Sequence, residues 1–527
     1  MSTTAVLLAI GIYVLATTGV ALWARRGSGQ TLEDYFLANR TLGGIVSALS
    51  YSATTYSAFM MVGLAGLTYR GGIGALGFEL IYLSGLLLVA FFGPRFWLAG
   101  RRYGIISPAE LLSVRYADRR VGWVAAVLSL VFLVPYSAVQ LMGVGYLLQG
   151  LSQGAIPFLA GVLLATVVAI AWAWLGGLRS VAWTDAAQAL LMLATSILVV
   201  VFALSHLGGV RQAVERLTVE TPDWLAVPGG GNYFQFSTFL GLSLPWFFFS
   251  LSNPQVAQRL FVPRSLSALR RMLLGFIAFG LIYTLLSVSW GLASRLLLPN
   301  LANPDLATPT LLASHVVPDI VALLAMVGIT AAAISTIDSI LLTLASLVAR
   351  DVLPLAESRR KHGNPLAWSR GVILLLGVVA FLFARLQLNW IALLSVASSA
   401  GLLALVPANV GAFFWKKGTA PGALASLIGG GLVSLVLQAT GWKPLGWWPG
   451  VWTLLVATGL FIAVSEVTSA PTERATQFVD EIAAALRPYL PDSGHIRPSF
   501  SPSTSPATTM GSPPSAASAP GSPEASR

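Results

Sequence analysis

The chain has 527 residues, of which 56% are hydrophobic and 10% charged, and its formal net charge is +11. So few charged groups cannot keep so apolar a surface in water, which excludes a soluble globular protein and indicates a lipid bilayer. The basic residues form short clusters between apolar runs rather than one basic face, so nucleic acid is not an expected partner. With no Cys and four scattered His, disulfide frameworks and transition-metal sites are not expected either.

Apolar runs long enough to cross ~30 Å of hydrocarbon recur from residue 4 to residue 467. Divided at Gly, Pro and charge clusters, they predict about 13 transmembrane spans. The expected spans are 4–24, 42–69, 72–98, 121–150, 155–175, 181–206, 236–258, 268–296, 319–348, 367–387, 388–415, 420–440 and 446–467. The first has no basic region before it and is followed by Arg25 and Arg26, so we expect a retained helix with its N-terminus outside, not a cleaved signal.

The distribution of basic residues supports this topology. With the N-terminus outside, six Lys and Arg residues fall in or beside outer loops and 21 in or beside inner loops. This bias is typical of a membrane protein whose Lys-rich and Arg-rich loops are cytoplasmic.

The composition changes after residue 467. A short amphipathic stretch covers 476–490, and a Ser/Pro/Ala/Thr-rich segment from about 498 to 527 is predicted to be disordered. The sequence therefore predicts a transmembrane domain over 1–467 and a cytoplasmic tail over 468–527, with no room for a fused signalling domain.

The second span contains a hydroxyl-rich stretch at residues 50–57. In lipid, an interrupted helix is tolerated only where its freed carbonyls line a cavity or bind an ion, so this stretch is a candidate unwound site. The alternative is a continuous helix whose Ser and Thr side chains bond to their own carbonyls.

The ninth span has hydroxyl side chains on one face. At ~100° per residue they fall within an arc of roughly 100°. They are Ser335, Thr336, Ser339, Thr343 and Ser346. Such a stripe either lets membrane helices pack closely or supplies oxygen ligands, which suit Na⁺ rather than a transition metal.

Three carboxylates lie within spans, where ionisable groups are expensive and indicate function. Glu79 is in the third span, Asp185 near the inner end of the sixth, and Asp338 beside the hydroxyl stripe. Asp185 has the alternative role of accepting backbone N–H bonds at a helix N-terminus. Glu79 and Asp338 have the alternative of a protonated, hydrogen-bonded carboxyl.

The seventh span carries Pro245 and ends in Asn-Pro-Gln at 253–255, so it too is predicted to be discontinuous. Its distance from the first break fits inverted repeats at about 42–206 and 236–415. The side chains of Trp246, Tyr136 and Gln140 are candidates to line a solute pocket, with ordinary packing as the alternative.

The segment Gly-Gly-Leu-Arg-Ser-Val-Ala-Trp-Thr-Asp-Ala-Ala-Gln at 176–188 resembles the signature of the sodium:solute symporters. Residues 35–40, 254–259 and 422–429 are also similar to patterns of that family. The resemblance covers residues from about 5 to 465. It implies an all-α, leucine-transporter-type fold of 5+5 core helices, with one extra N-terminal and two extra C-terminal helices.

The resemblance also implies an Na⁺ site of three backbone carbonyls and two hydroxyls. The matching positions are Ala53, Tyr56 and Ala332 for the carbonyls, and Ser335 and Thr336 for the hydroxyls.

The resemblance assigns roles to further side chains. Asp185 matches a residue implicated in sodium coupling, Tyr136 and Trp246 match positions that affect proline uptake, and Glu79 matches a sugar-contacting position. Two residues depart from the pattern. Thr55 stands where proline transporters carry an essential Asp, and Asp338 replaces a commonly small polar residue. Asp338 either restores the missing charge or favours H⁺.

We therefore expect a Na⁺-coupled symporter of a small organic solute in a bacterial-type cytoplasmic membrane, working by alternating access. The solute is expected to be a monocarboxylate, pantothenate or an amino-acid-like compound. The alternatives are a proton-coupled symporter, a sugar-type solute and, less favoured, a transporter-like sensor. An enzyme is not expected, and the oligomeric state is left open.

Overall fold

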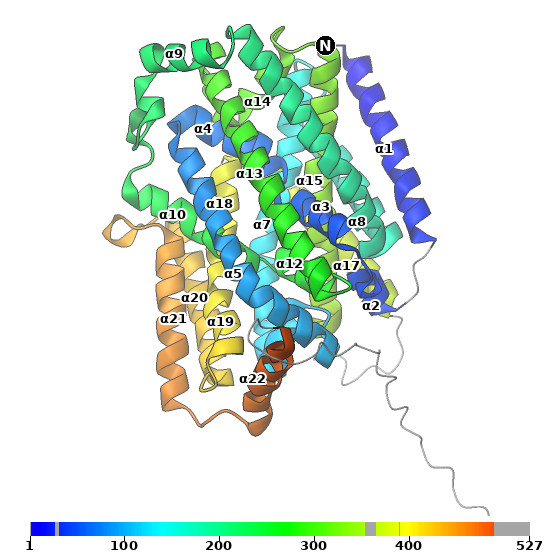
Figure 1. Cartoon of the computed structure of the whole chain (residues 1–527), viewed down its shortest axis with the longest axis vertical. Helices are drawn as coiled ribbons and strands as arrows, with labels where there is room; N and C mark the ends of the chain where they lie inside the picture. The colour runs from blue at the N-terminus through cyan, green and yellow to red at the C-terminus, as the bar shows by residue number, and fades with distance from the viewer. Residues whose placement is uncertain (1, 27–30, 354–364, 389, 490–527) are drawn as a thin grey trace, which may run out of the picture. The chain divides into compact units, whose positions relative to one another are not determined.

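The structure is a computed structural model that describes residues 2–26, 31–353, 365–388 and 390–489. Within these ranges the chain is helical, and its one β-type contact is an isolated bridge between Leu42 and Pro263 (Figure 1). Residues 1–485 form one compact unit, and only 486–489 of the second unit, 486–527, are described. The predicted all-α class is confirmed. The segment predicted to be disordered lies outside the described residues.

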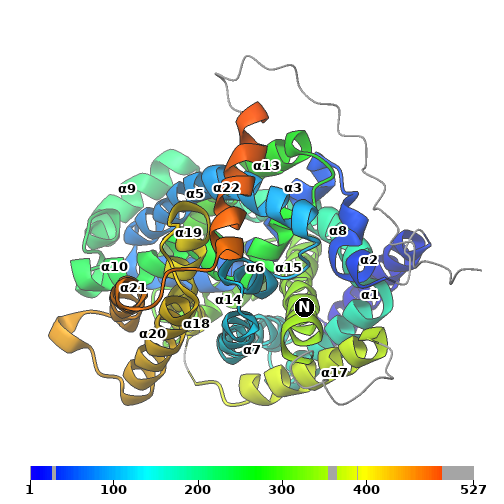
Figure 2. The same cartoon turned by 90° about the horizontal axis from the view of Figure 1, so that it is seen from below.

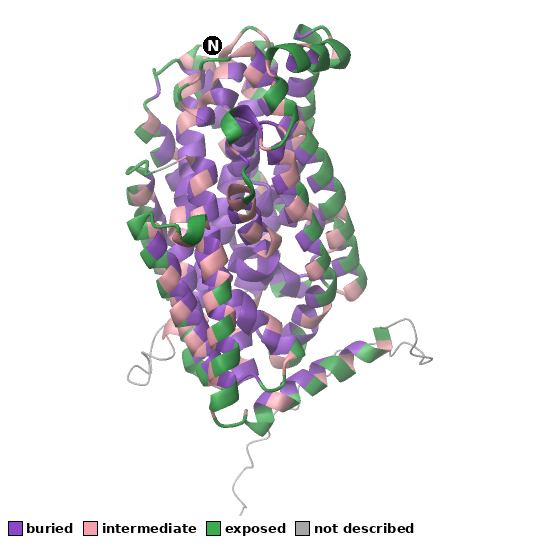
Figure 3. Ribbon diagram, turned by 90° about the vertical axis from the view of Figure 1, so that its left-hand side faces the viewer, coloured by how far each residue is buried: buried purple, intermediate pink, exposed green. Residues whose placement is uncertain are grey.

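Ten helices in the described ranges are long and apolar enough to cross a membrane. They are α1 (Thr3–Arg25), α5 (Gly74–Tyr103), α7 (Arg119–Leu151), α8 (Phe158–His206), α13 (Leu266–Leu297), α15 (Asp319–Leu347), α17 (Pro365–Ala384), α18 (Ile391–Leu402) continuing into α19 (Val406–Phe414), α20 (Ala420–Thr440) and α21 (Pro449–Val467). Large apolar side chains are exposed on the peripheral helices, for example Leu15 on α1 and Leu432 on α20 (Figure 3). A surface of this kind suits contact with lipid.

The second predicted span is interrupted. Helix α3 (Gly44–Thr55) ends before Tyr56, whose φ and ψ are −88° and 72°. The chain becomes helical again at Ala58, passes through a π-helical turn, η2 (Phe59–Leu64), and continues as α4 (Ala65–Gly71). The turn's carbonyls are bonded from neighbouring elements: Ser287 donates to the carbonyl of Met60 at 2.5 Å. The break therefore lies at Tyr56 and Ser57, inside the predicted stretch.

The seventh predicted span is interrupted as well. It consists of α10 (Phe236–Phe247), α11 (Phe249–Ser252), α12 (Pro254–Ala257) and the 3₁₀ turn η5 (Gln258–Phe261). Asn253, between α11 and α12, has the extended conformation φ −93°, ψ 110°. Pro254 cannot donate to a preceding carbonyl, which explains why the helix stops here and restarts.

The fifth and sixth predicted spans are not separated by a loop. Both lie in α8, which bends at Gly177 (φ 59°, ψ −172°). A Cβ atom at this position would lie 2.8 Å from the carbonyl oxygen of Tyr35, so both the backbone conformation and the available space require glycine. The Tyr35 hydroxyl fastens the bend by donating to the carbonyl of Ala173 at 2.7 Å. The sequence predicts a break between these two spans, but it does not predict that one helix continues through the bend.

Helix α15 lies at the centre of the molecule. Every residue from Ala325 to Leu347 is buried, and α15 packs against α8, α7, α17 and α3. Helix α3 packs in turn against α8 and α13. The break at Tyr56 is thereby brought against the hydroxyl face of α15.

The predicted amphipathic stretch forms α22 (Glu473–Leu486), which begins three residues earlier than expected. Its buried Phe478 stacks on Tyr103 of α5 at 5.1 Å and contacts Phe413 of α19 at 5.9 Å. Figure 2 shows α22 in front of the helix bundle in the view from below. Arg102 donates to Glu481 at 2.6 Å and holds the pKa of Glu481 below its usual range. An amphipathic helix thus covers the ends of α5 and α19.

Candidate ion and solute site

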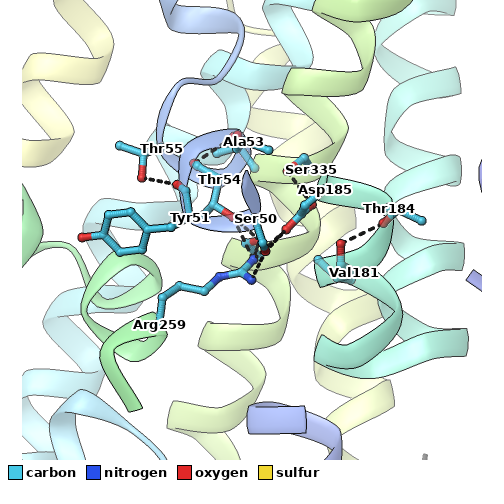
Figure 4. Close-up of polar contacts among 12 residues, drawn as sticks. Ser50, Tyr51, Ala53, Thr54, Thr55, Val181, Thr184, Asp185, Arg259 and Ser335 are labelled. Carbon is cyan, nitrogen blue, oxygen red and sulfur yellow. Dashed lines mark hydrogen bonds and ion pairs between the residues drawn. The ribbon is translucent and has the colours of Figure 1, made fainter. Parts of the chain in front are cut away.

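Asp185 is the hub of a buried polar network. Its side chain is 0% exposed. One carboxylate oxygen, Oδ1, accepts a hydrogen bond from Ser335 of α15 at 2.6 Å. The other, Oδ2, accepts from Ser50 of α3 at 2.6 Å and from Arg259 at 3.0 Å (Figure 4). Asp185 lies well inside α8 and has no described backbone partner, so the expected alternative of a helix N-terminal role is wrong.

Arg259 is the cation of this network. It projects from η5, and its side chain is 5% exposed. Besides Asp185, it donates to Ser50 at 2.5 Å, Thr54 at 2.7 Å and Ser339 at 2.5 Å. A buried charge needs a partner and hydrogen-bond acceptors, and Arg259 has a carboxylate partner and acceptors for both Nη1 and Nη2. The guanidinium therefore joins α3, α8 and α15 to the end of the interrupted seventh segment.

A second cluster of oxygens surrounds the Thr336 hydroxyl. Its Oγ1 lies 3.3 Å from the carbonyl oxygen of Ala53, 3.0 Å from that of Thr54 and 3.1 Å from that of Ala332. Because α3 ends at Thr55, the carbonyls of Ala53 and Thr54 belong to its last turn and lose their helical partners. A hydroxyl has one proton, so it cannot satisfy three carbonyls at once. Such an oxygen cluster suits a hard cation.

The structure thus brings together Ala53, Ala332 and Thr336, with Ser335 next in sequence. No described hydrogen bond links Ser335 or Tyr56 to these three residues, and the Ser335 hydroxyl bonds to Asp185 instead. The Tyr56 ring packs on Phe276 at 5.1 Å, and its hydroxyl has no partner among the described residues. Among the described residues there is no group of three or more His, Cys, Asp or Glu that could hold a metal.

Asp338 and Thr55 lie beside this region without joining it. Asp338 is 1% exposed, and its Oδ1 has no hydrogen-bond partner among the described residues. Thr55 donates to the carbonyl of Tyr51, one helical turn back, at 2.7 Å. The side chain that stands where proline transporters carry an Asp therefore bonds within its own helix.

Sequence reasoning did not assign a site role to Arg259, and it named Ser50, Thr54 and Ser339 only as members of hydroxyl-rich stretches. The available signal was a single basic residue directly after the apolar seventh segment, together with hydroxyls on the facing spans. From sequence alone, such a residue is interpreted as a topology signal, because its pairing with Asp185 depends on the fold.

The predicted solute residues Tyr136 and Trp246 lie in an aromatic cluster. Around the indole of Trp246, ring centroids lie at 4.5 Å for Phe249, 5.1 Å for Phe59 and 6.5 Å for Tyr136. Tyr82 of α5 is 6.2 Å away. The cluster therefore joins α5, α7 and both interrupted segments.

Several buried polar groups at or near this cluster have no partner. Among the described residues, neither amide atom of Gln140, one turn beyond Tyr136 on α7, has a hydrogen-bond partner, and the same holds for the Trp246 Nε1 and the Tyr82 hydroxyl. Glu79, one turn before Tyr82 on α5, is 2% exposed and makes no described hydrogen bond or ion pair. Buried polar groups are normally satisfied, so this concentration indicates a place where a ligand supplies the partners.

Ten described helices that can cross a membrane, together with two apolar segments interrupted at buried polar sites, are the arrangement of a polytopic membrane transporter. The family model described as "Sodium:solute symporter family" matches residues 35–430. The chain belongs to the sodium:solute symporter family, as the signature at 176–188 predicts.

Curated relatives include the sodium/pantothenate symporters of Escherichia coli (strain K12) and Haemophilus influenzae, each 28% identical. The first alignment covers 87% of this chain and 95% of the relative, the second 80% and 88%. An osmoregulated proline transporter of Bacillus subtilis is 25% identical over 89% of this chain and 96% of its own. These relatives are transporters, not enzymes.

Solved structures support the fold. A substrate-bound, outward-open Na⁺-coupled sialic acid symporter matches with a TM-score of 0.73 and 20% identity, covering 89% of this chain and 99% of that one. A nucleobase-cation-symport-1 transporter matches with a TM-score of 0.55 at 14% identity, over 85% and 98%. The chain is thus a Na⁺-coupled solute symporter of a multi-pass membrane family, and these predictions are confirmed.

Proposed function

We propose that Na⁺ binds between the end of α3 and the hydroxyl face of α15. The ligands are the backbone carbonyls of Ala53, Tyr56 and Ala332 and the hydroxyls of Ser335 and Thr336. The observation that carries this proposal is the position of Thr336 Oγ1, 3.3 Å from the carbonyl oxygen of Ala53 at the broken end of α3 and 3.1 Å from that of Ala332 within α15. A cation at this place would satisfy both carbonyls together, which the single hydroxyl proton cannot do.

Asp185 has an orienting role in this proposal. Because it accepts the Ser335 proton at 2.6 Å, the lone pairs of that hydroxyl remain free for a cation. Its carboxylate lies one hydrogen bond from the ion site, through the Ser335 hydroxyl. Asp338 is a second sodium-coupling residue, supported by its buried, unpartnered Oδ1.

The solute binds beside the aromatic cluster, at Glu79, Tyr136, Gln140 and Trp246. Support comes from the unpartnered amide of Gln140 and indole N–H of Trp246. Given the relatives, pantothenate is the first compound to test, followed by proline and a monocarboxylate. The carboxylate of Glu79 favours the hydroxyl or ammonium end of a solute over its carboxylate end.

The architecture in this proposal is a 5+5 inverted repeat over residues 42–206 and 236–415, in a membrane domain of 1–467 with thirteen helices. The two interrupted helices, each leading one repeat, support it. The N-terminus is outside, the tail 468–527 is cytoplasmic, and the membrane is the bacterial-type cytoplasmic membrane. The repeats alternate access, and each inward Na⁺ gains ~2.3 kcal/mol per 100 mV of inside-negative potential.

A proton-coupled symporter is the second candidate, because Asp338 lies buried without a partner for its Oδ1. Proteoliposomes separate the two candidates. Uptake of labelled pantothenate, proline and lactate is measured with an inward Na⁺ gradient at equal pH, and with an inward pH gradient in choline chloride. The proposal expects accumulation only with Na⁺. Uptake driven by pH alone would establish the second candidate.

A further inference from the structure

The Arg259 guanidinium occupies the position of a counter-cation beside Asp185. It is bonded to Asp185 at 3.0 Å and to hydroxyls of α3 and α15 at 2.5–2.7 Å. Asp185 is in turn one hydrogen bond from Ser335. The carboxylate next to the proposed ion site is therefore already neutralised by the protein itself (Figure 4).

This pairing raises a charge problem for ion binding. With Asp185 and Arg259 paired, Na⁺ at Ser335 and Thr336 would add a positive charge that no carboxylate hydrogen-bonded to the site compensates, which is unfavourable in a buried region. Asp338 makes no described hydrogen bond to Ser335, Asp185 or Arg259. The carboxylate physically linked to the ion site is Asp185, and its charge becomes available only when Arg259 releases it.

We infer that Arg259 is a tethered counter-cation that exchanges with Na⁺: it holds Asp185 when Na⁺ is absent and releases Asp185 when Na⁺ binds. The inference rests on the proposed Na⁺ site. Arg259 is a positioning residue, since it acts through Asp185.

The location of Arg259 makes the exchange a coupling step. It lies on η5, directly after α12 and four residues after the unpartnered side chain of Gln255. The neighbouring Gln258 donates to Ser346 of α15 and to the carbonyl of Ile106, both at 3.1 Å. Release of Arg259 therefore removes its bonds between η5 and α3, α8 and α15 and leaves the Gln258 bonds as the remaining described side-chain hydrogen bonds of this turn. This loosens the end of the interrupted seventh segment, whose earlier part carries Trp246.

The test uses Na⁺ alone as the probe. Thermal stability of the purified full chain is measured against NaCl at constant ionic strength, with choline chloride as the balancing salt. Arg259→Gln leaves Asp185 without its counter-cation, so we expect a lower melting temperature in choline chloride and a larger rise with NaCl than in the unaltered chain. The NaCl concentration for half-maximal stabilisation should fall at least three-fold.

Two further variants keep the test decisive if Arg259→Gln folds poorly. Arg259→Lys keeps the charge and should retain a Na⁺ response close to that of the unaltered chain. Asp185→Asn with Arg259→Gln removes both charges, so it should recover stability in choline chloride but lose the gain in Na⁺ affinity. If this double variant keeps the gain, or if Arg259→Gln responds to Na⁺ no more strongly than the unaltered chain, the exchange is wrong.

A labelling experiment tests the coupling step. The chain has no Cys, so Val256→Cys on α12 gives a single thiol at a buried position. We expect Na⁺ to change its maleimide labelling rate at least three-fold, and Arg259→Gln to abolish that change. A Na⁺ effect that persists with Arg259→Gln would contradict the inference. An unaltered chain with no Na⁺-specific stabilisation would instead overturn the proposed Na⁺ site.

Discussion

The two interrupted segments differ in how their polar groups are satisfied. Around the end of α3, Ser50 and Thr54 are bonded to Arg259, and Asp185 has three partners. Around the seventh segment, the side-chain oxygen of Asn253 and both amide atoms of Gln255 have no partner within the part of the chain that the structure describes. The hydroxyls of Ser52 and Tyr56 at the first break also have no partner among the described residues, so the contrast lies in the charged pair, which is bonded at the first break. In the proposed function this contrast separates an ion side from a solute side.

The largest effect is expected from removing the charge of Asp185, to which Ser50, Arg259 and Ser335 all donate. Asp185→Asn leaves Arg259 buried without its counter-ion, which should lower the free energy of unfolding by about 3–5 kcal/mol and abolish Na⁺-driven uptake. Thermal unfolding and proteoliposome uptake measure the two effects. The double variant Asp185→Asn with Arg259→Gln should recover most of the stability but not the uptake. Full uptake with Asp185→Asn alone would remove Asp185 from the mechanism.

The next effect concerns the oxygens of the ion site. Thr336→Val keeps the shape but removes the hydroxyl, so the Na⁺ concentration for half-maximal uptake should rise about tenfold, equivalent to ~1.4 kcal/mol. Thr343→Val, two turns along the same face of α15, is the matched control and should leave Na⁺ dependence unchanged. Equal effects of the two substitutions would indicate helix packing rather than a ligand role.

A substitution on the solute side should not lower the free energy of unfolding, in contrast to Asp185→Asn on the ion side. Gln140 is buried with an unsatisfied amide, so Gln140→Leu should preserve or increase stability, by up to about 1–3 kcal/mol, while weakening solute affinity roughly tenfold. Competition binding of pantothenate and proline, alongside thermal unfolding, measures both. If Gln140→Leu destabilises the protein and leaves binding intact, Gln140 is a packing residue.

The smallest effect is expected at Thr55. Its hydroxyl bonds to Tyr51 within α3, so Thr55→Val should change stability by less than about 0.5 kcal/mol. Na⁺ dependence should change by less than a factor of two. A large loss of Na⁺ affinity, measured by the same uptake titration, would place Thr55 in the ion site and contradict the assignment of its hydroxyl to bonding within α3.

The sequence predicts much of this organisation because lipid leaves few alternatives. Apolar runs predict the helices, and hydroxyls or Pro within them predict the two breaks. It does not predict the continuity of α8, since a glycine with positive φ can end a helix or bend it. Nor does it pair Arg259 with Asp185, because 74 residues separate them and only the packing of α3, α8 and α15 brings them together. The orientation of the Tyr56 ring depends on α13 in the same way.

Direct binding of ²²Na⁺ to the purified protein tests the central claim of a Na⁺ site between α3 and α15. At constant ionic strength, the unaltered chain should bind ²²Na⁺ saturably, and Thr336→Val should require about ten times more Na⁺ for half-saturation, a difference of ~1.4 kcal/mol. The Thr343→Val control should match the unaltered chain. Unchanged ²²Na⁺ affinity in a folded Thr336→Val protein would contradict the site.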